Sequence, residues 1–121
     1  MLAAANLLEA FDRVSEYWSP KVIGRVNDQY LKVAKLKGRL AWHAHEEEDE
    51  LFYIVHGRLR MELPDGVVEL KQGEFLTVPK GTQHNPVAEE ECWVLLIETV
   101  TTKHTGDVVT PLTRSLEEQL A

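Results

Sequence analysis

The 121-residue sequence predicts a single all-β domain, built as an antiparallel sandwich or barrel. Three observations lead to this prediction. Short segments rich in β-branched and aromatic residues follow one another between residues 21 and 100. Turn-forming residues such as Asn27-Asp28 and Pro64-Asp65-Gly66 separate these segments. No long amphipathic helix stands between them, which excludes the alternating strand and helix pattern of a parallel sheet.

The N-terminal residues predict one helix that packs outside this β-domain. Apolar side chains recur at steps of four, three and four residues, at Leu7, Phe11, Val14 and Trp18. Such a stripe is typical of a helix with one buried face. Asn6 and Glu9 have the spacing of a capping box, and Ser19-Pro20 ends the pattern because the residue before a proline avoids helical backbone angles. We therefore expect a helix over residues 7–18.

The clearest pair of strands is a hairpin with the sequence RLRMELPDGVVELK, over residues 58–71. In its first strand, Arg58, Arg60 and Glu62 alternate with apolar residues, so one face is expected in water and the other in the core. The last residues, PLTRSLEEQLA, contain the capping pattern Ser115-x-x-Glu118. A short C-terminal helix and a frayed tail are both compatible with this segment.

Charge and cysteine content exclude several classes of function. The chain has 13 basic and 20 acidic residues, a net charge of −7, so neither nucleic acid nor an anionic membrane surface is expected as a partner. Its single cysteine, Cys92, opens an apolar run and is expected to be buried and inert. No internal disulfide is possible, which fits a cytoplasmic protein. The edge-strand candidate KVIGRVN, three tryptophans and the N-terminal helix favour a homodimer.

The stretch WHAHEEEDELFYIVHG, residues 42–57, contains the first candidate site residues. His43 and His45 are two residues apart, so on a strand both side chains point to the same face. The acidic run that follows is expected to form a turn or bulge that resets this alternation. After it, Glu50 leads an otherwise apolar row, and a carboxylate there is costly to bury unless it is paired or binds a cation.

A third histidine, His84, follows the turn formed by Pro79 and Gly81 in GEFLTVPKGTQHNP. His43, His45, Glu50 and His84 together form a nitrogen and oxygen donor set suited to a transition metal. The residues alone leave a second interpretation open, in which the acidic run is a solvated turn and the histidines are structural. His56, at a strand end, and His104, in the polar stretch TTKHTGD, are expected to lie at the surface.

These two stretches resemble the paired motifs of the cupin superfamily. The first motif corresponds to Gly38, His43, His45, Glu50 and Gly57, and the second to Gly73, Pro79, Gly81 and His84. Two positions depart from the family pattern: four residues rather than five separate Gly38 from His43, and Ala88 stands where asparagine is frequent. The resemblance spans roughly residues 30–100. Within the superfamily, the chain is similar to small single-domain cupins of the mannose-6-phosphate-isomerase-like or uncharacterised cupin-2 type.

The resemblance implies a double-stranded β-helix, or jelly-roll barrel, in a single domain of residues 1–121. The barrel would span residues 21–100, with a C-terminal extension over residues 101–121. It also implies that His43, His45, Glu50 and His84 bind one divalent ion of Zn, Mn, Fe, Ni, Co or Cu. Three functions are compatible with such a site: a metal-dependent isomerase-like enzyme acting on a small polar metabolite, a metal-dependent dioxygenase, or a non-catalytic module that binds a small molecule.

Overall fold

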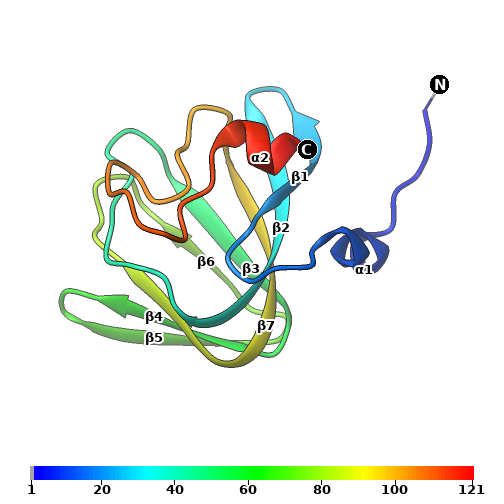
Figure 1. The fold of residues 1–121 in the computed structure, drawn as a ribbon. Helices are drawn as coiled ribbons and strands as arrows, with labels where there is room; N and C mark the ends of the chain where they lie inside the picture. Colours follow the sequence, from blue (N-terminus) through cyan, green and yellow to red (C-terminus); the bar gives the residue numbers. More distant parts are fainter. Residues whose placement is uncertain (1) are drawn as a thin grey trace.

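The computed structural model describes residues 2–121, and most of them form antiparallel β-structure. Its strands are β1 (Lys21–Val26), β2 (Gln29–Arg39), β3 (Glu50–His56), β4 (Arg58–Leu63), β5 (Gly66–Lys71), β6 (Phe75–Val78) and β7 (Asn85–Thr99). Its helical segments are α1 (Leu7–Ala10), the 3₁₀ turn η1 (Phe11–Arg13) and α2 (Leu116–Leu120). The predicted all-β barrel with small helices is confirmed (Figure 1).

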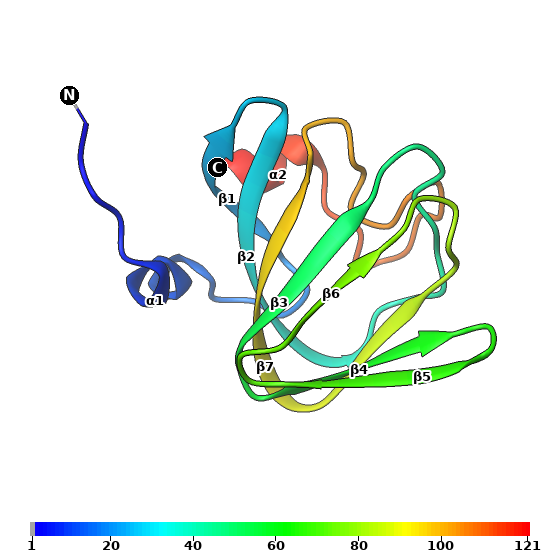
Figure 2. The same cartoon turned by 180° about the vertical axis from the view of Figure 1, so that it is seen from behind.

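The long strand β7 connects the two halves of the barrel. Almost all of β7, from Val87 to Thr99, pairs with β2 on one side, and its second part pairs with β3 on the other, in the strand order β1-β2-β7-β3-β6. Its first part pairs with β4, which in turn pairs with β5 (Figure 2). The predicted hairpin is confirmed by the register of β4 and β5, which runs from Arg58 opposite Lys71 to Leu63 opposite Gly66.

The barrel interior holds the main hydrophobic core, which excludes water from the centre of the molecule. Its buried members include residues from six of the strands, among them Leu36, Phe52, Met61 and Val94. Cys92 is also fully buried there, and burial raises the pKa of its thiol to about 12. The thiol is therefore protonated at neutral pH and acts as a small apolar side chain, as predicted.

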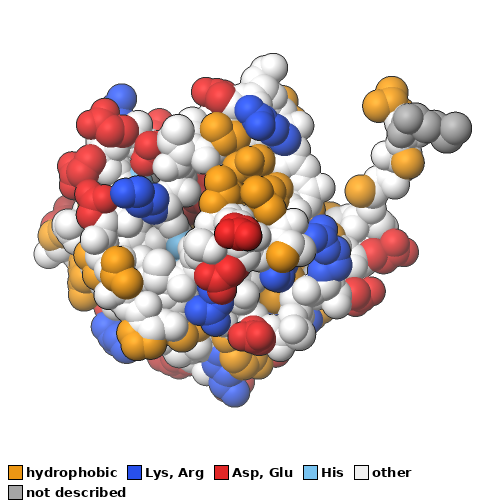
Figure 3. All heavy atoms as spheres, turned by 45° about the horizontal axis from the view of Figure 1, so that its top comes forward, with side chains coloured by type: hydrophobic (Ala, Val, Ile, Leu, Met, Phe, Trp, Pro, Cys, Tyr) orange, Lys and Arg blue, Asp and Glu red, His pale blue; other side chains and the backbone are white. Residues whose placement is uncertain are grey.

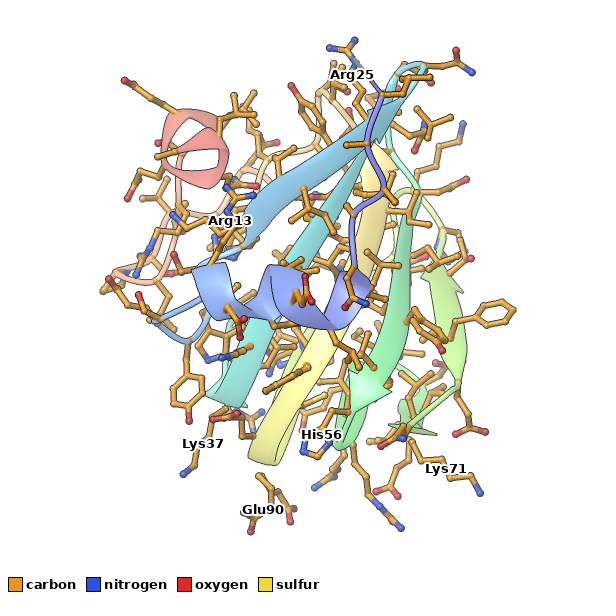
Figure 4. All side chains as sticks on the ribbon, turned by 90° about the vertical axis from the view of Figure 1, so that its right-hand side faces the viewer. Arg13, Arg25, Lys37, His56, Lys71 and Glu90 are labelled. Carbon is orange, nitrogen blue, oxygen red and sulfur yellow. The ribbon has the colours of Figure 1, made fainter. Side chains whose placement is uncertain are left out.

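A second, smaller core covers the outer face of the sheet. Phe11 is fully buried there and stacks on Trp93, with ring centroids 4.8 Å apart. Val14 and Val33 complete the cluster. The helical segment α1 therefore lies across the outside of the strands (Figure 4), which explains why β2 and β7 carry apolar residues on both faces.

The N-terminal helix is shorter than predicted, and the expected range 7–18 is wrong. It begins where the sequence indicates, with the Asn6 side chain accepting a hydrogen bond from the Glu9 amide at 3.0 Å. It ends as α-helix at Ala10 and as a 3₁₀ turn at Arg13. The backbone is already extended at Val14 (φ −99°, ψ 107°), and further on Trp18 takes a left-handed backbone angle (φ 56°) and enters the barrel core instead of continuing the stripe.

The C-terminal residues form the helix that the capping pattern indicated. The Ser115 hydroxyl accepts from the Glu118 amide at 3.1 Å, and the Glu118 carboxylate accepts from the Ser115 amide at 3.0 Å. This capping box begins α2, which packs beside β1 at one end of the barrel (Figure 1). None of the helices in the described part of the chain is both long and apolar enough to cross a lipid bilayer.

Candidate metal centre

The four predicted ligand residues come from three segments that meet inside the barrel. His43 and His45 lie in the connection between β2 and β3, Glu50 is the first residue of β3, and His84 directly precedes β7. The sequence suggested that His43 and His45 lie on one continuous strand, but in the structure they do not. Instead, an isolated pair of backbone hydrogen bonds joins His43 and His84, each amide donating to the other's carbonyl at 3.0 and 2.9 Å.

The turn between the histidines and the carboxylate has the role that the sequence predicted. Glu46, Glu47 and Asp49 are exposed and Glu48 is half-buried, whereas Glu50 is buried with 5% of its surface accessible. The turn therefore resets the alternation of side chains, and the only fully buried carboxylate of the run is the one that faces the histidines.

The donor atoms of these residues converge. One donor atom from each of His43, His45, Glu50 and His84 lies within 4.8 Å of all the others, and all four residues are buried. Oε1 of Glu50 is 3.4 Å from Nε2 of His45 and 3.5 Å from Nε2 of His84. These distances are long for hydrogen bonds but suit side chains arranged around a common ion.

The hydrogen bonds of the imidazoles leave nitrogens free for a metal. Nδ1 of His43 lies 2.8 Å from the Ala41 carbonyl, and Nδ1 of His84 lies 2.9 Å from the Thr82 carbonyl. A carbonyl only accepts, so Nδ1 carries the proton in both rings and Nε2 keeps its lone pair. Within residues 2–121, the buried Nε2 atoms of His45 and His84 have no hydrogen-bond partner. A cation would satisfy both, so the donor set fits a metal ion.

Electrostatics favour the metal-binding forms of His43 and Glu50. Burial lowers the pKa of His43 to about 4, helped by the neighbouring His84, so this imidazole is neutral at pH 7. Burial acts to raise the pKa of Glu50, but contacts with Glu98, His45 and His84 outweigh it and keep the pKa well below its usual range. Burial acts to lower the pKa of His45, and the Glu50 carboxylate more than offsets this, so the net shift is upward.

A buried polar cluster lies directly behind Glu50. Glu98 stands opposite Glu50 in the β3–β7 pair, and its carboxylate is 2.6 Å from the ammonium of Lys32. Lys32 also donates to the Gln119 side chain at 2.5 Å, and Gln119 donates to the Arg114 carbonyl at 3.1 Å. Burial raises the pKa of Glu98 well above its usual range, and the Glu50 charge raises it further. The pKa values of the two neighbouring carboxyls are therefore shifted in opposite directions.

A small cavity of about 30 Å³ lies beside the ligands, and its walls are almost wholly apolar. Its lining residues are Trp18, Pro20, Ala34, Leu36, Leu40, His43, Glu50, Phe52, Pro86, Val94, Leu96 and His104. When the top of Figure 1 is turned toward the viewer, acidic side chains gather at the upper left of the surface and hydrophobic ones near its centre (Figure 3). A larger hollow of about 640 Å³ lies instead along β4 and β5 and includes none of the four candidate ligands.

The remaining two histidines differ from one another. His56 is exposed at the end of β3, as predicted, at the opposite end of the molecule from α2 (Figure 4). The predicted surface position of His104 is wrong. His104 lies in the C-terminal extension, is partly buried, and lines the same cavity as His43 and Glu50. Its polar sequence neighbours gave no signal of this position, because the contact depends on how the extension folds back over the barrel.

Comparisons with known proteins agree with this architecture. The family model described as Cupin_2, cupin domain, matches residues 32–98. The uncharacterised protein YdbB of Bacillus subtilis (strain 168) is 36% identical over 80 residues, which cover 65% of this chain and 71% of that protein.

Two solved structures have the same fold at similar sequence identity. A cupin-2 domain protein from Shewanella frigidimarina NCIMB 400 is 37% identical with a TM-score of 0.77, covering 78% of this chain and 93% of that one. Protein NMB1881 from Neisseria meningitidis is 32% identical with a TM-score of 0.74, covering 80% of this chain and 99% of that one. The chain therefore belongs to the cupin family.

Proposed function

We propose that His43, His45, Glu50 and His84 bind one divalent transition metal ion, and that the protein is a metal-dependent enzyme acting on a small organic molecule. One observation carries this proposal. Two buried imidazole nitrogens face a buried carboxylate oxygen at 3.4 and 3.5 Å and have no other partner within residues 2–121. Leaving such groups unsatisfied costs about 1–3 kcal/mol each, which a bound cation would remove.

The residues around the site have distinct roles in this proposal. Three imidazoles and one carboxylate hold the ion, and carbonyls of Ala41 and Thr82 fix the orientation of two of the rings. A divalent ion in this donor set supplies Lewis-acid polarisation of a substrate oxygen, and iron would add chemistry with dioxygen. The apolar walls exclude water from the space beside the ligands.

The cavity narrows the class of substrate. Its walls offer many apolar contacts and few hydrogen-bonding groups, and its volume of about 30 Å³ has room for only a small part of a substrate. A small apolar group next to an oxygen that contacts the metal therefore fits better than a phosphorylated sugar. The expectation of a polar sugar substrate therefore has less support than the expectation of a metal site. The isomerase-like reaction, in which a proton moves beside a polarised oxygen, remains our first candidate for compact hydroxy-carbonyl compounds.

A metal-dependent dioxygenase is the second candidate, because the apolar lining of the cavity also favours this reaction. An apolar cavity of about 30 Å³ has the size of a diatomic molecule or one water, and its lining would favour the apolar one. Oxygen uptake by iron-loaded protein over a panel of diketones and diols would support this reaction. Interconversion of small ketoses and aldoses by the same protein, without oxygen uptake, would support the isomerase-like reaction.

Metal content tests the proposal itself. Protein purified without a histidine tag or a nickel column should contain close to one equivalent of a transition metal. His45→Ala and Glu50→Gln should lose it, whereas the matched controls His56→Ala and Glu47→Gln, at exposed positions, should retain it. Equal metal content in all five proteins would refute the ligand assignment. Stoichiometric metal without turnover of either panel would favour the non-catalytic binding module.

The homodimer and the cytoplasmic location stay predictions. Leu2 and Leu8 of the N-terminal segment are exposed, and this segment extends away from the barrel (Figure 2). If a second copy covers this segment, Leu8→Glu should shift the sedimentation of the protein from dimer to monomer. Sedimentation of the unaltered protein as a monomer would exclude the homodimer.

A further inference from the structure

The cavity beside the candidate ligands is lined by one polar side chain, His104, that is neither a candidate metal ligand nor fully hydrogen-bonded within the fold. Of its polar lining side chains, His43 and Glu50 belong to the ligand set. The indole of Trp18 donates to the Lys37 carbonyl at 2.7 Å, so its single donor is already occupied. The remaining lining residues are apolar apart from His104. Among the side chains that line the cavity, His104 is therefore the one left to hydrogen-bond a small molecule.

The hydrogen bonds of His104 determine what it can offer. Its Nδ1 accepts from the Arg114 backbone amide at 2.9 Å. An imidazole nitrogen that accepts an N–H has no proton of its own, so in the neutral ring the proton is on Nε2. Burial lowers the pKa of His104 to about 4, so the neutral ring is the form present at neutral pH. Within residues 2–121, the hydrogen bond found for this ring is the one at Nδ1, and His104 lines the cavity, so its Nε2–H is available as a donor.

The C-terminal extension holds His104 firmly in this position. Gly106 packs so closely on the Ala44 carbonyl that a side chain at residue 106 would collide with it. Arg114, which orients the imidazole through its amide, accepts through its carbonyl from the Gln119 side chain. Gln119 in turn accepts from the buried Lys32. The extension is thus joined both to the segment between His43 and His45 and to the polar cluster behind Glu50.

We propose that His104 is a substrate-positioning residue, whose Nε2–H donates a hydrogen bond to an acceptor atom of a small molecule bound beside the metal. The proposal rests on the proposed function, because the small molecule is taken to bind at the ion held by the four ligands. The small molecules that His104 would position are compact and carry an oxygen or nitrogen acceptor next to the atom that contacts the metal. In this proposal, residues of the two barrel motifs bind the ion, and His104 of the C-terminal extension orients the small molecule that binds to the ion.

Two substitutions test the two hydrogen bonds of His104 one at a time: the bond that Nδ1 accepts from Arg114, and the proposed bond that Nε2–H donates to the small molecule. In His104→Asn, the side-chain oxygen replaces Nδ1 and can still accept from Arg114, but no donor reaches the position of Nε2. In His104→Gln, the amide nitrogen replaces Nε2 as a donor, whereas the acceptor for Arg114 is lost. A purely structural role would make His104→Asn resemble the unaltered protein. A positioning role would make His104→Gln resemble it.

The probe is azide, a small anion that binds metals and accepts hydrogen bonds. The protein and its variants are loaded with Co(II), cobalt uptake is measured, and azide is titrated through the visible absorption of the ion. We expect His104→Asn to bind azide about 3- to 10-fold more weakly, the effect of one hydrogen bond. His104→Gln should stay within about twofold of the unaltered protein, as should the control His56→Gln.

The outcomes distinguish this proposal from the one on which it rests. Failure of the unaltered protein to take up cobalt would refute the metal site, and the role of His104 with it. Normal cobalt uptake with equal azide affinity in all variants would refute the role of His104 alone. Weaker azide binding in His104→Gln than in His104→Asn would likewise overturn it, in favour of a structural role. Should His104→Gln fold poorly, the loss in stably folded His104→Asn still decides between the two.

Discussion

The ammonium of Lys32 and the carboxylate of Glu98 lie 2.6 Å apart on neighbouring strands, and both side chains are almost completely buried. Glu50 stands beside Glu98 on the next strand, so one cation and two carboxyls share the centre of the barrel. Burial and the neighbouring Glu50 charge raise the pKa of Glu98 well above its usual range. The fold thus places a buried ammonium and two buried carboxyls directly behind the candidate metal ligands.

Removing the cation of this cluster should destabilise the protein strongly. Lys32→Met replaces the ammonium by an apolar side chain of similar length and leaves the carboxyls without their partner. Breaking a buried pair in this way costs about 3–5 kcal/mol of unfolding free energy. Urea denaturation of metal-free protein would measure the loss. Lys37→Met, at an exposed position of the same strand, is the matched control and should change stability by less than about 0.5 kcal/mol.

Metal should stabilise the native protein through the same ligands. An ion that binds the folded state alone raises the unfolding free energy by about 2.7 kcal/mol when its free concentration is 100-fold above Kd. We therefore expect EDTA to lower the thermal midpoint, and Zn(II) or Co(II) to restore it. His45→Ala should abolish the response, whereas His56→Ala should keep it. A midpoint that rises equally with metal in His45→Ala would contradict the prediction.

A side chain at residue 106 should disturb the C-terminal extension and the ligands together. Gly106 has a left-handed backbone angle (φ 58°), and an added Cβ would collide with the Ala44 carbonyl between the two candidate ligands His43 and His45. Gly73 has a similar angle (φ 88°), but a Cβ there would meet open space. Gly106→Ala should therefore cost about 1–3 kcal/mol more than Gly73→Ala and weaken Co(II) binding. Equal effects of the two substitutions would mean that the extension moves aside freely.

The buried neutral His104 should make stability depend on pH. Its pKa is about 4 in the folded protein and about 6.5 in the unfolded chain. Between these values the unfolded chain binds a proton that the folded state does not, so stability falls as pH decreases from about 6.5 to about 4. In EDTA, urea midpoints at pH 7 and pH 5 should differ more for the unaltered protein than for His104→Gln. Equal differences would show that His104 does not contribute to this slope.

The parts of the molecule that could be predicted from sequence depend on local patterns. The β4–β5 hairpin follows from alternation and a strong turn, and the capping pairs at Asn6 and Ser115 mark where α1 and α2 begin. Glu50 could be chosen among five neighbouring acidic residues because it alone leads an apolar row. Alternation would also have identified Lys32, which shares its strand face with the buried residues Ala34 and Leu36.

The features that could not be predicted depend on contacts between distant residues. Trp18 continues the apolar stripe of the N-terminal helix in sequence, but its indole bonds the Lys37 carbonyl and its ring fills the barrel core. Tertiary contacts of this kind outweigh helix propensity in short segments. His104 is surrounded by polar residues in sequence, and only its contact with Arg114 and the return of the extension bring it to the cavity.

The contact between Lys32 and Gln119 joins two segments that lie 87 residues apart in the chain. Opening of the C-terminal extension would leave the buried ammonium of Lys32 with one acceptor fewer, which is costly in the protein interior. Backbone amides of the extension should therefore exchange with solvent together with those of the barrel strands, and not before them.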